Sequence, residues 1–367
     1  MSTERSAVVE TFMNIVQIDS PTFHEEKMTK HVFDRLTALG LSPEIDKEGN
    51  VLAYFPGDPK KETFMINAHL DTVQAEGDHV EPYIDKDGWI RSKGNTILGA
   101  DNKTAVAAIL ETLDKLVSEK SKDHHPLEIV FTVSEESGSH GAHGLNYKKI
   151  TAKRGYIFDA GGRDFGEMII SSPAYARFDL KIIGKGAHAS RPELGINVLP
   201  IFAKAFLNTR VGKVNERTRV NFGVVSVGKV DGPVNTVPGE IIVSGEVRSM
   251  DEKEMAKTCK AIVENFEKEA KAAGAKIESK IVRENGSFEF FPKDSFIIRT
   301  LEVLKQFGIK PKLVRSWGCY EANIFAEHGI KMLNISDGSL DSHALTERIK
   351  ASDLERLVDL IYFLVKQ

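Results

Sequence analysis

Two short runs place imidazole and carboxylate side chains directly after strongly apolar segments. His69 and Asp71 follow the apolar run 64–66, and Asp101 follows the apolar pair 97–98. A buried strand that ends in such groups needs a partner for them, because uncompensated charge in a protein interior is costly. A metal ion is a suitable partner, since zinc takes imidazole nitrogen and carboxylate oxygen as ligands. The two runs therefore predict metal-binding residues.

Two further segments show the same pattern. The apolar run 129–133 leads to Glu135 and Glu136, and the run 155–158 leads to Asp159. In open α/β sheets, active sites lie at the carboxyl ends of the strands. We therefore expect the polar residues at these strand ends to lie close together.

The residue types indicate a hydrolytic site with two metal ions. A carboxylate can bridge two ions that lie about 3.5–4 Å apart. Glu135 and Glu136 are neighbours in an extended or turning chain, so they point different ways, and one can bind metal while the other acts as a general base. Asp71 lies two residues from His69 and is well placed to hold its imidazole. The candidate ligands contain no sulfur and are His69, Asp101, Glu136, Asp159 and His343.

The elements that must position these residues alternate between helix and strand patterns over residues 1–172. The motif Thr22-x-x-Glu25 predicts a capping box at the start of the second helix. This alternation predicts an α/β sheet covered on both faces. The predicted elements include a helix at 102–118 and strands at 51–55, 64–68, 127–133 and 155–158.

Residues 173–284 differ in character from the segments on either side. Their order, βαββαβ, is that of a ferredoxin-like unit, and the segment is long enough for its own core. Residues 285–367 return to α/β alternation, so the middle segment is predicted to be inserted into one α/β domain formed by 1–172 and 285–367. The predicted elements of the insertion are strands at 175–183, 222–230, 240–248 and 276–283 and helices at 196–210 and 252–272.

Composition narrows the function class. The chain has 367 residues, which suits two domains. A net charge of −4 gives no indication of a nucleic-acid or anionic membrane partner. Two distant cysteines, Cys259 and Cys319, predict no disulfide scaffold. Without a signal-peptide core or a membrane-length apolar run, the sequence predicts a cytoplasmic protein.

Five segments together resemble the di-zinc exopeptidases of the peptidase T, glutamate carboxypeptidase and aminoacylase family. They follow the family's order over nearly the whole chain, and the peptidase T type is the most similar. The resemblance implies a zinc-exopeptidase-type catalytic domain with an inserted ferredoxin-like lid and dimerisation domain. The segments are AHLDTV (68–73), GADNKTAVAAIL (99–110), SEESGSHGA (134–142), FDAGG (158–162) and DSHALTERI (341–349).

The resemblance also implies a role for each metal ligand. His69 and Asp159 would bind one zinc ion. Glu136 and His343 would bind the other. Asp101 would bridge both ions, followed by a strained or cis peptide bond. The metal could also be manganese or cobalt, because oxygen and nitrogen ligands accept each of these.

Four more residues receive catalytic or binding roles by resemblance. Glu135 would be the general base and acid. In the insertion, His188 would stabilise the oxyanion, often in the site of the neighbouring subunit of a homodimer formed through residues 173–284. Asn235 and Arg248 would bind a substrate carboxylate. Glu321, with its neighbour Tyr320, stands where family members often carry Asp and would shape the substrate pocket.

Three functions remain open on this reading. The first is a tripeptide aminopeptidase that releases the N-terminal residue through a zinc-bridged hydroxide, with Glu135 as the general base. The second is a carboxypeptidase or N-acyl-amino-acid deacylase on the same scaffold. The third, a non-catalytic binding relative, would normally lack the base or a ligand, and this chain retains all of them.

Overall fold

The computed structural model describes residues 5–74, 79–120, 122–228 and 231–367. The chain forms two compact units. The first contains residues 1–170, 289–316 and 320–367, and the second contains residues 171–288 and 317–319. The insertion predicted at 173–284 lies within the second unit.

The main sheet supplies strand ends for the candidate ligands. Strands β3, β6, β7 and β18 run parallel to one another, so their carboxyl ends meet at one edge. Every residue of β3 is buried, as expected for a strand covered on both faces. The strand order is β1 (Glu44–Ile45), β2 (Val51–Phe55), β6 (Leu127–Thr132), β3 (Phe64–His69), β7 (Arg154–Ile157), β18 (Lys331–Ile335), β8 (Met168–Ser172) and β16 (Phe288–Glu289), with β17 (Leu313–Arg315) beside β8.

Helices pack on this sheet and on one another. Helix α3 packs against β3, α1 and α9, and α7 packs on the same helix α9. Helix α8 packs on β18 and α4, and helix α2 packs on β2. A small separate sheet joins β4 (Pro82–Ile84), β5 (Trp89–Ser92) and β19 (Ile349–Lys350). The helices are α1 (Ala7–Ile15), α2 (Glu26–Ala38), α3 (Ala100–Glu119), α4 (His140–Gly144), α7 (Ser295–Gln306), α8 (Glu321–Glu327) and α9 (Ala351–Lys366). This α/β arrangement confirms the predicted fold class.

The capping box predicted at the start of α2 is wrong. Glu25 is the N-cap residue, and no side chain caps the helix. The Thr22 hydroxyl instead donates to Asp71 Oδ2 at 2.9 Å. Glu25 accepts hydrogen bonds from the backbone N–H groups of Phe23 and Ser134. Both side chains therefore hold segments near the strand ends rather than the helix.

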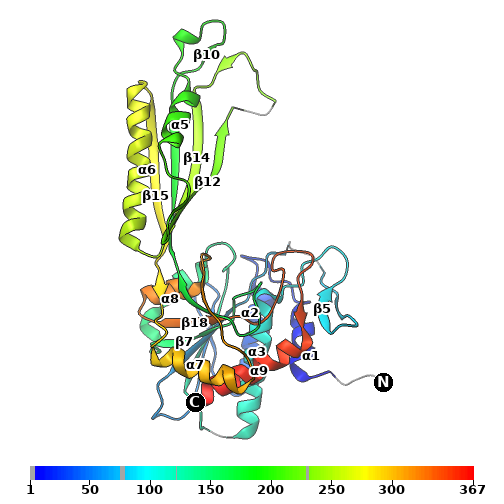
Figure 1. Cartoon of the computed structure of the whole chain (residues 1–367). Coiled ribbons are helices and arrows are strands. Elements are labelled where there is room, and N and C mark those ends of the chain that lie inside the picture. Colours follow the sequence, from blue (N-terminus) through cyan, green and yellow to red (C-terminus); the bar gives the residue numbers. More distant parts are fainter. Residues whose placement is uncertain (1–4, 75–78, 121, 229–230) are drawn as a thin grey trace. The chain divides into compact units, whose positions relative to one another are not determined.

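The second unit has the predicted βαββαβ order, with β11 (Gly212–Asn215) as an additional strand. Its sheet is antiparallel, in the order β11-β12-β14-β9-β15. Figure 1 shows helices α5 and α6 lying along this sheet, and Phe178, Cys259 and Phe266 lie in the core between them. The bounds are β9 (Ala174–Ile183), α5 (Val198–Leu207), β12 (Thr218–Val227), β14 (Glu240–Ser249), α6 (Glu252–Ala272) and β15 (Lys276–Asn285), and a short ribbon pairs β10 (Ala187–His188) with β13 (Thr236–Val237).

Among the helices that the structure describes, none has both the length and the hydrophobicity that crossing a bilayer requires.

Candidate active site

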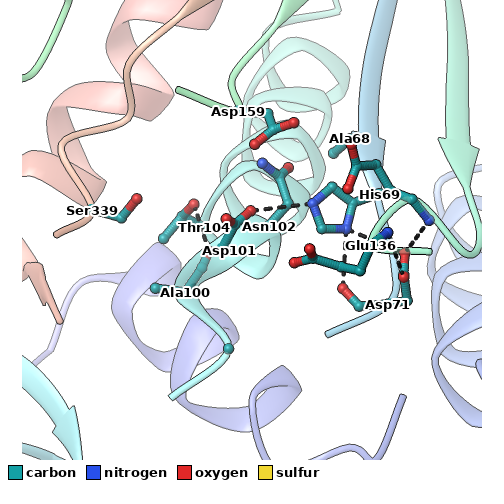
Figure 2. Close-up of polar contacts among 12 residues, drawn as sticks. Ala68, His69, Asp71, Ala100, Asp101, Asn102, Thr104, Glu136, Asp159 and Ser339 are labelled. Carbon is teal, nitrogen blue, oxygen red and sulfur yellow. Dashed lines mark hydrogen bonds and ion pairs between the residues drawn. The ribbon is translucent and has the colours of Figure 1, made fainter. Parts of the chain in front are cut away.

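The predicted metal ligands of the first unit converge at the carboxyl edge of its sheet. His69 is the last residue of β3, Asp159 follows β7, and Asp101 lies in the first turn of α3. Glu136 follows β6 on a loop, and Figure 2 shows its carboxylate near the side chains of His69 and Asp101. Because the parallel strands end side by side, segments far apart in the sequence deliver these groups to one place.

The ligand atoms form overlapping groups, each within 4.8 Å. One group consists of His69, Asp101 and Asp159, and another consists of Asp101, Glu136 and His343. Asp101 is shared, with Oδ1 at 3.1 Å from His69 Nε2 and Oδ2 at 3.4 Å from His343 Nε2. His343 Nε2 also lies 2.7 Å from Glu136 Oε1. One carboxylate common to two ligand groups is the arrangement that a bridged pair of ions requires.

The electrostatics of this cluster favour cations. Burial raises the pKa of Glu135 to about 8, and the nearby charges of Glu136 and Glu321 act in the same direction. Burial and the charges of Asp101 and Glu135 raise the pKa of Asp159 well above its usual value. Divalent ions relieve such repulsion and keep the carboxylates ionised.

The donor set therefore fits two divalent ions. It provides imidazole nitrogen and carboxylate oxygen and no thiolate, which suits zinc and also manganese or cobalt. A third group, formed by His69, Glu135 and Glu136, brings the proposed base within the same 4.8 Å limit. The base and the ligands thus lie in one cluster.

Asp71 connects the histidine ligand with the two glutamates. His69 Nδ1 lies 3.0 Å from the Asp71 backbone oxygen and 3.3 Å from Oδ1. The fully buried Asp71 carboxylate accepts the backbone N–H groups of Glu135 at 2.9 Å and Glu136 at 3.1 Å. One side chain thus orients the imidazole, leaving Nε2 for metal, and fixes the loop that carries the base.

The first turn of α3 has an unusual backbone. The peptide bond between Asp101 and Asn102 is cis, as the resemblance implied, and Asn102 Nδ2 donates to the Phe158 backbone oxygen at 2.9 Å. Glu347 accepts backbone N–H groups of this turn. Glu347 has no predicted role, although it lies in the segment 341–349. Its partners are about 250 positions away, so no local pattern could indicate the contact.

Glu321 is a buried residue. Its side chain is only 2% exposed, and its Oε2 accepts the Thr132 hydroxyl at 2.7 Å. Burial raises its pKa to about 7. Helix α8 thus places this carboxylate inside the protein, and the expectation that its segment shapes the substrate pocket stays a prediction. The neighbouring Tyr320 hydroxyl bonds Ser316 Oγ at 2.8 Å.

Three predicted residues belong to the second unit. His188 is exposed on β10, its Nδ1 accepts the Ser190 N–H at 3.2 Å, and Asn235 Nδ2 lies 3.4 Å from its Nε2. Arg248 on β14 forms an ion pair with Glu246 at 3.0 Å. Within this unit His188 and Asn235 thus lie together, while Arg248 already has a carboxylate partner. Their roles toward a substrate stay predictions.

The fold and site define a hydrolase class in which carboxylates and histidines at one sheet edge bind metal and an adjacent glutamate serves as base. Residues 65–367 match the model of peptidase family M20/M25/M40. The chain belongs to this family and is a metallopeptidase, which confirms the resemblance seen in the sequence.

Several relatives are similar over their full lengths. The chain is 30% identical to the protein YqjE of Bacillus subtilis, covering 98% of each chain. It is 31% identical to the solved structure of the aminopeptidase PepT from Bacillus cereus, with a TM-score of 0.92 and coverage of 98% and 97%. A tripeptidase structure from Staphylococcus aureus is 30% identical, with a TM-score of 0.93 and the same coverage.

Proposed function

We propose that this protein is a tripeptide aminopeptidase that works with two divalent metal ions, for which zinc is the first candidate. The observation that carries the proposal is the shared position of Asp101 between two ligand groups, with Glu135 in the same cluster. The likeness to an aminopeptidase and a tripeptidase, each at about the same length and 30% identity or more, supports the substrate class.

The reaction follows from the placement of the side chains. When bound, the two ions lower the pKa of a water molecule and polarise the peptide carbonyl. Glu135 takes the proton of the attacking water and passes it to the leaving amine. Asp71 holds the backbone of Glu135 in place. His188 would stabilise the oxygen that gains negative charge.

The test uses one tripeptide with three different residues and its N-acetylated copy. Metal-loaded and metal-stripped protein is incubated with each, and mass spectrometry identifies the products. We expect metal-dependent release of the N-terminal residue, blocked by acetylation. Release from the C-terminus, or removal of the acetyl group, would move the assignment to a carboxypeptidase or a deacylase.

We also propose a homodimer formed through the second unit. Strand β11 pairs with β12 only as far as Val220. Beyond Val220, the outer edge of β12 therefore offers backbone N–H and C=O groups for pairing with a second copy of the chain. Val224 and Val225, about half exposed, lie on this stretch. The other edge strand, β15, carries several lysines and glutamates, which discourage pairing.

Light scattering tests the dimer. We expect twice the 40.7 kDa chain mass, and Val225→Lys should shift the protein toward the monomer. A monomeric wild type would refute both the dimer and any role of His188 in a neighbouring site.

We further propose a cytoplasmic location, because both cysteines are free thiols.

A further inference from the structure

Two buried carboxylates lie on either side of the loop that carries His343. Asp337 follows β18 and is 1% exposed, and Glu347 precedes β19 and is 2% exposed. Neither belongs to the ligand groups. Burying a carboxylate is costly unless hydrogen bonds or charges compensate it, so the partners of these two groups indicate what they do.

Glu347 binds the backbone immediately before and at the bridging ligand. Its Oε2 accepts the N–H groups of Gly99 at 2.6 Å and Ala100 at 3.0 Å, and its Oε1 faces the N–H of Asp101 at 3.4 Å. These are free N–H groups at the start of α3, where a negative charge is favoured.

Asp337 binds the same helix one turn further on. Its Oδ2 accepts the hydroxyl of Thr104, while its Oδ1 accepts the backbone N–H and the hydroxyl of Ser339 at 2.9 and 2.7 Å. Figure 2 shows Thr104 and Ser339 on one side of Asp101. The loop is thus attached to α3 at both of its ends.

Between these attachments the loop is closed by two backbone hydrogen bonds between Leu340 and Arg348, which join the loop to itself and not to α3. The His343 side chain is 48% exposed, and its backbone has a φ of 66°, a left-handed conformation that is unfavourable for residues other than glycine. Asp341 has a φ of 58°. A ligand on such a segment keeps a fixed position only if the surrounding contacts determine it.

We infer that Asp337 and Glu347 are positioning residues that hold the His343 loop and the Asp101 turn in a fixed position relative to each other. They would thereby place the ligands of the second metal ion, the one assigned to Glu136 and His343, before that ion binds. This inference rests on the two-metal site of the proposed function. It assigns to each carboxylate a larger effect on the second ion than on the first, because the first ion shares only Asp101 with the attached segments and keeps His69, at the end of β3, and Asp159, after β7.

The decisive variant is Glu347→Gln. A glutamine has one acceptor and one donor, so it cannot accept from Gly99, Ala100 and Asp101 together in either orientation. Each protein is equilibrated with buffered Co²⁺ or Zn²⁺, and bound metal is measured by elemental analysis and, for cobalt, by visible absorption. We expect the second ion to bind about 10-fold to 100-fold more weakly than in the wild type, the usual cost of disturbing a residue that orients a ligand. The first ion should be affected much less, because it shares only Asp101 with this turn.

Asp337 offers a matched pair of variants. In Asp337→Asn the new amide can donate to the Thr104 oxygen, whose hydroxyl can turn to the Ala100 backbone oxygen 3.0 Å away. We therefore expect Asp337→Asn to bind the second ion nearly as the wild type does, and Asp337→Ala to bind it more weakly. Glu355→Gln, at an exposed position of α9, serves as the surface control and should leave both ions unchanged.

Separate readouts distinguish positioning from general stability. Unfolding of the metal-free variants shows whether the fold survives. Wild-type binding of both ions by Glu347→Gln, or equal weakening of both ions, would overturn the inference. If the wild type binds two ions and Glu347→Gln loses only the second, yet no tripeptide is cleaved, the proposed substrate fails and the positioning role stands.

Discussion

The two consecutive glutamates of the site have different surroundings. Glu136 contacts His343 at 2.7 Å, whereas Glu135 lies among carboxylates and burial raises its pKa to about 8. This difference supports the assignment of the base to Glu135 and of metal binding to Glu136.

The Glu135→Gln variant, which replaces the carboxylate by an amide, tests the assignment of the base. The amide keeps the size of the side chain but cannot accept the proton, so we expect kcat to fall by about 10²–10⁴-fold. Elemental analysis should still find both metal ions. Turnover within a few-fold of the wild type would show that another group is the base.

His125 lies outside the metal site, and both of its ring nitrogens are occupied. Nδ1 lies 2.7 Å from the Glu62 backbone oxygen, Nε2 accepts from Arg299 at 2.8 Å, and the ring stacks on Phe64 at 3.9 Å. Burial lowers its pKa to about 4, and the positive charge of Arg299 acts in the same direction. The folded protein thus keeps this ring neutral.

The pH dependence of stability follows from this pKa. The unfolded chain binds a proton near pH 6.5 and the folded chain only near pH 4, so the stabilisation is present above pH 6.5 and is lost as the pH falls to 4. Unfolding free energies of metal-free protein measured across this range should fall less steeply in His125→Asn. The exposed His24→Asn is the control, and an unchanged slope in His125→Asn would contradict the prediction.

At the level of elements, the register between β3 and β7 depends on a glycine. Gly155 is paired with Met65, and a Cβ at position 155 would lie 1.8 Å from the Met65 backbone oxygen. The two strands must approach closely because β3 ends at His69 and β7 leads to Asp159. The glycine therefore brings two ligands of one ion together.

Gly155→Ala should separate these strands. We expect a loss of about 3 kcal/mol in unfolding free energy, at the upper end for overpacking in a core, together with weaker binding of the first ion. Gly223→Ala is the matched control, because this glycine of β12 has its nearest outside atom at 3.9 Å. Denaturant unfolding and metal titration check both, and equal effects of the two variants would refute the argument.

At the level of the whole molecule, the metal site connects segments from residue 69 to residue 343, all within the first unit. Bound ions stabilise only the folded form of the part that holds them, by about 2.7 kcal/mol when free metal is 100-fold above its Kd. The second unit has its own hydrophobic core. Metal removal should therefore affect the two units unequally.

The two tryptophans make this measurable, since Trp89 belongs to the first unit and Trp317 to the second. A chelator should lower the midpoint of thermal unfolding reported by Trp89 in a Trp317→Phe protein, and added zinc should restore it. The midpoint reported by Trp317 in a Trp89→Phe protein should change much less. Equal shifts in both proteins would show that the units unfold together.

The sequence by itself determined the strands and helices that depend on local patterns and the residues that form the ligand groups. The strand 51–55 and the helix 252–272 have the predicted bounds, because hydrophobic periodicity and local turn signals act over a few residues. The convergence of His69, Glu136 and Asp159 could be predicted because polar groups at the ends of buried strands need compensation, and parallel strands bring their ends together.

Only the tertiary structure decided which other polar groups support the site. Thr22 binds Asp71 across 49 positions and Glu347 binds Gly99 across 248, while Glu321 lies inside the protein against Thr132. A side chain can serve locally, for example as a helix cap, or it can bind a distant buried group. It binds the distant group where the desolvation of that group would otherwise stay uncompensated. That choice depends on which segments the fold places side by side, and the sequence around each residue does not contain this information.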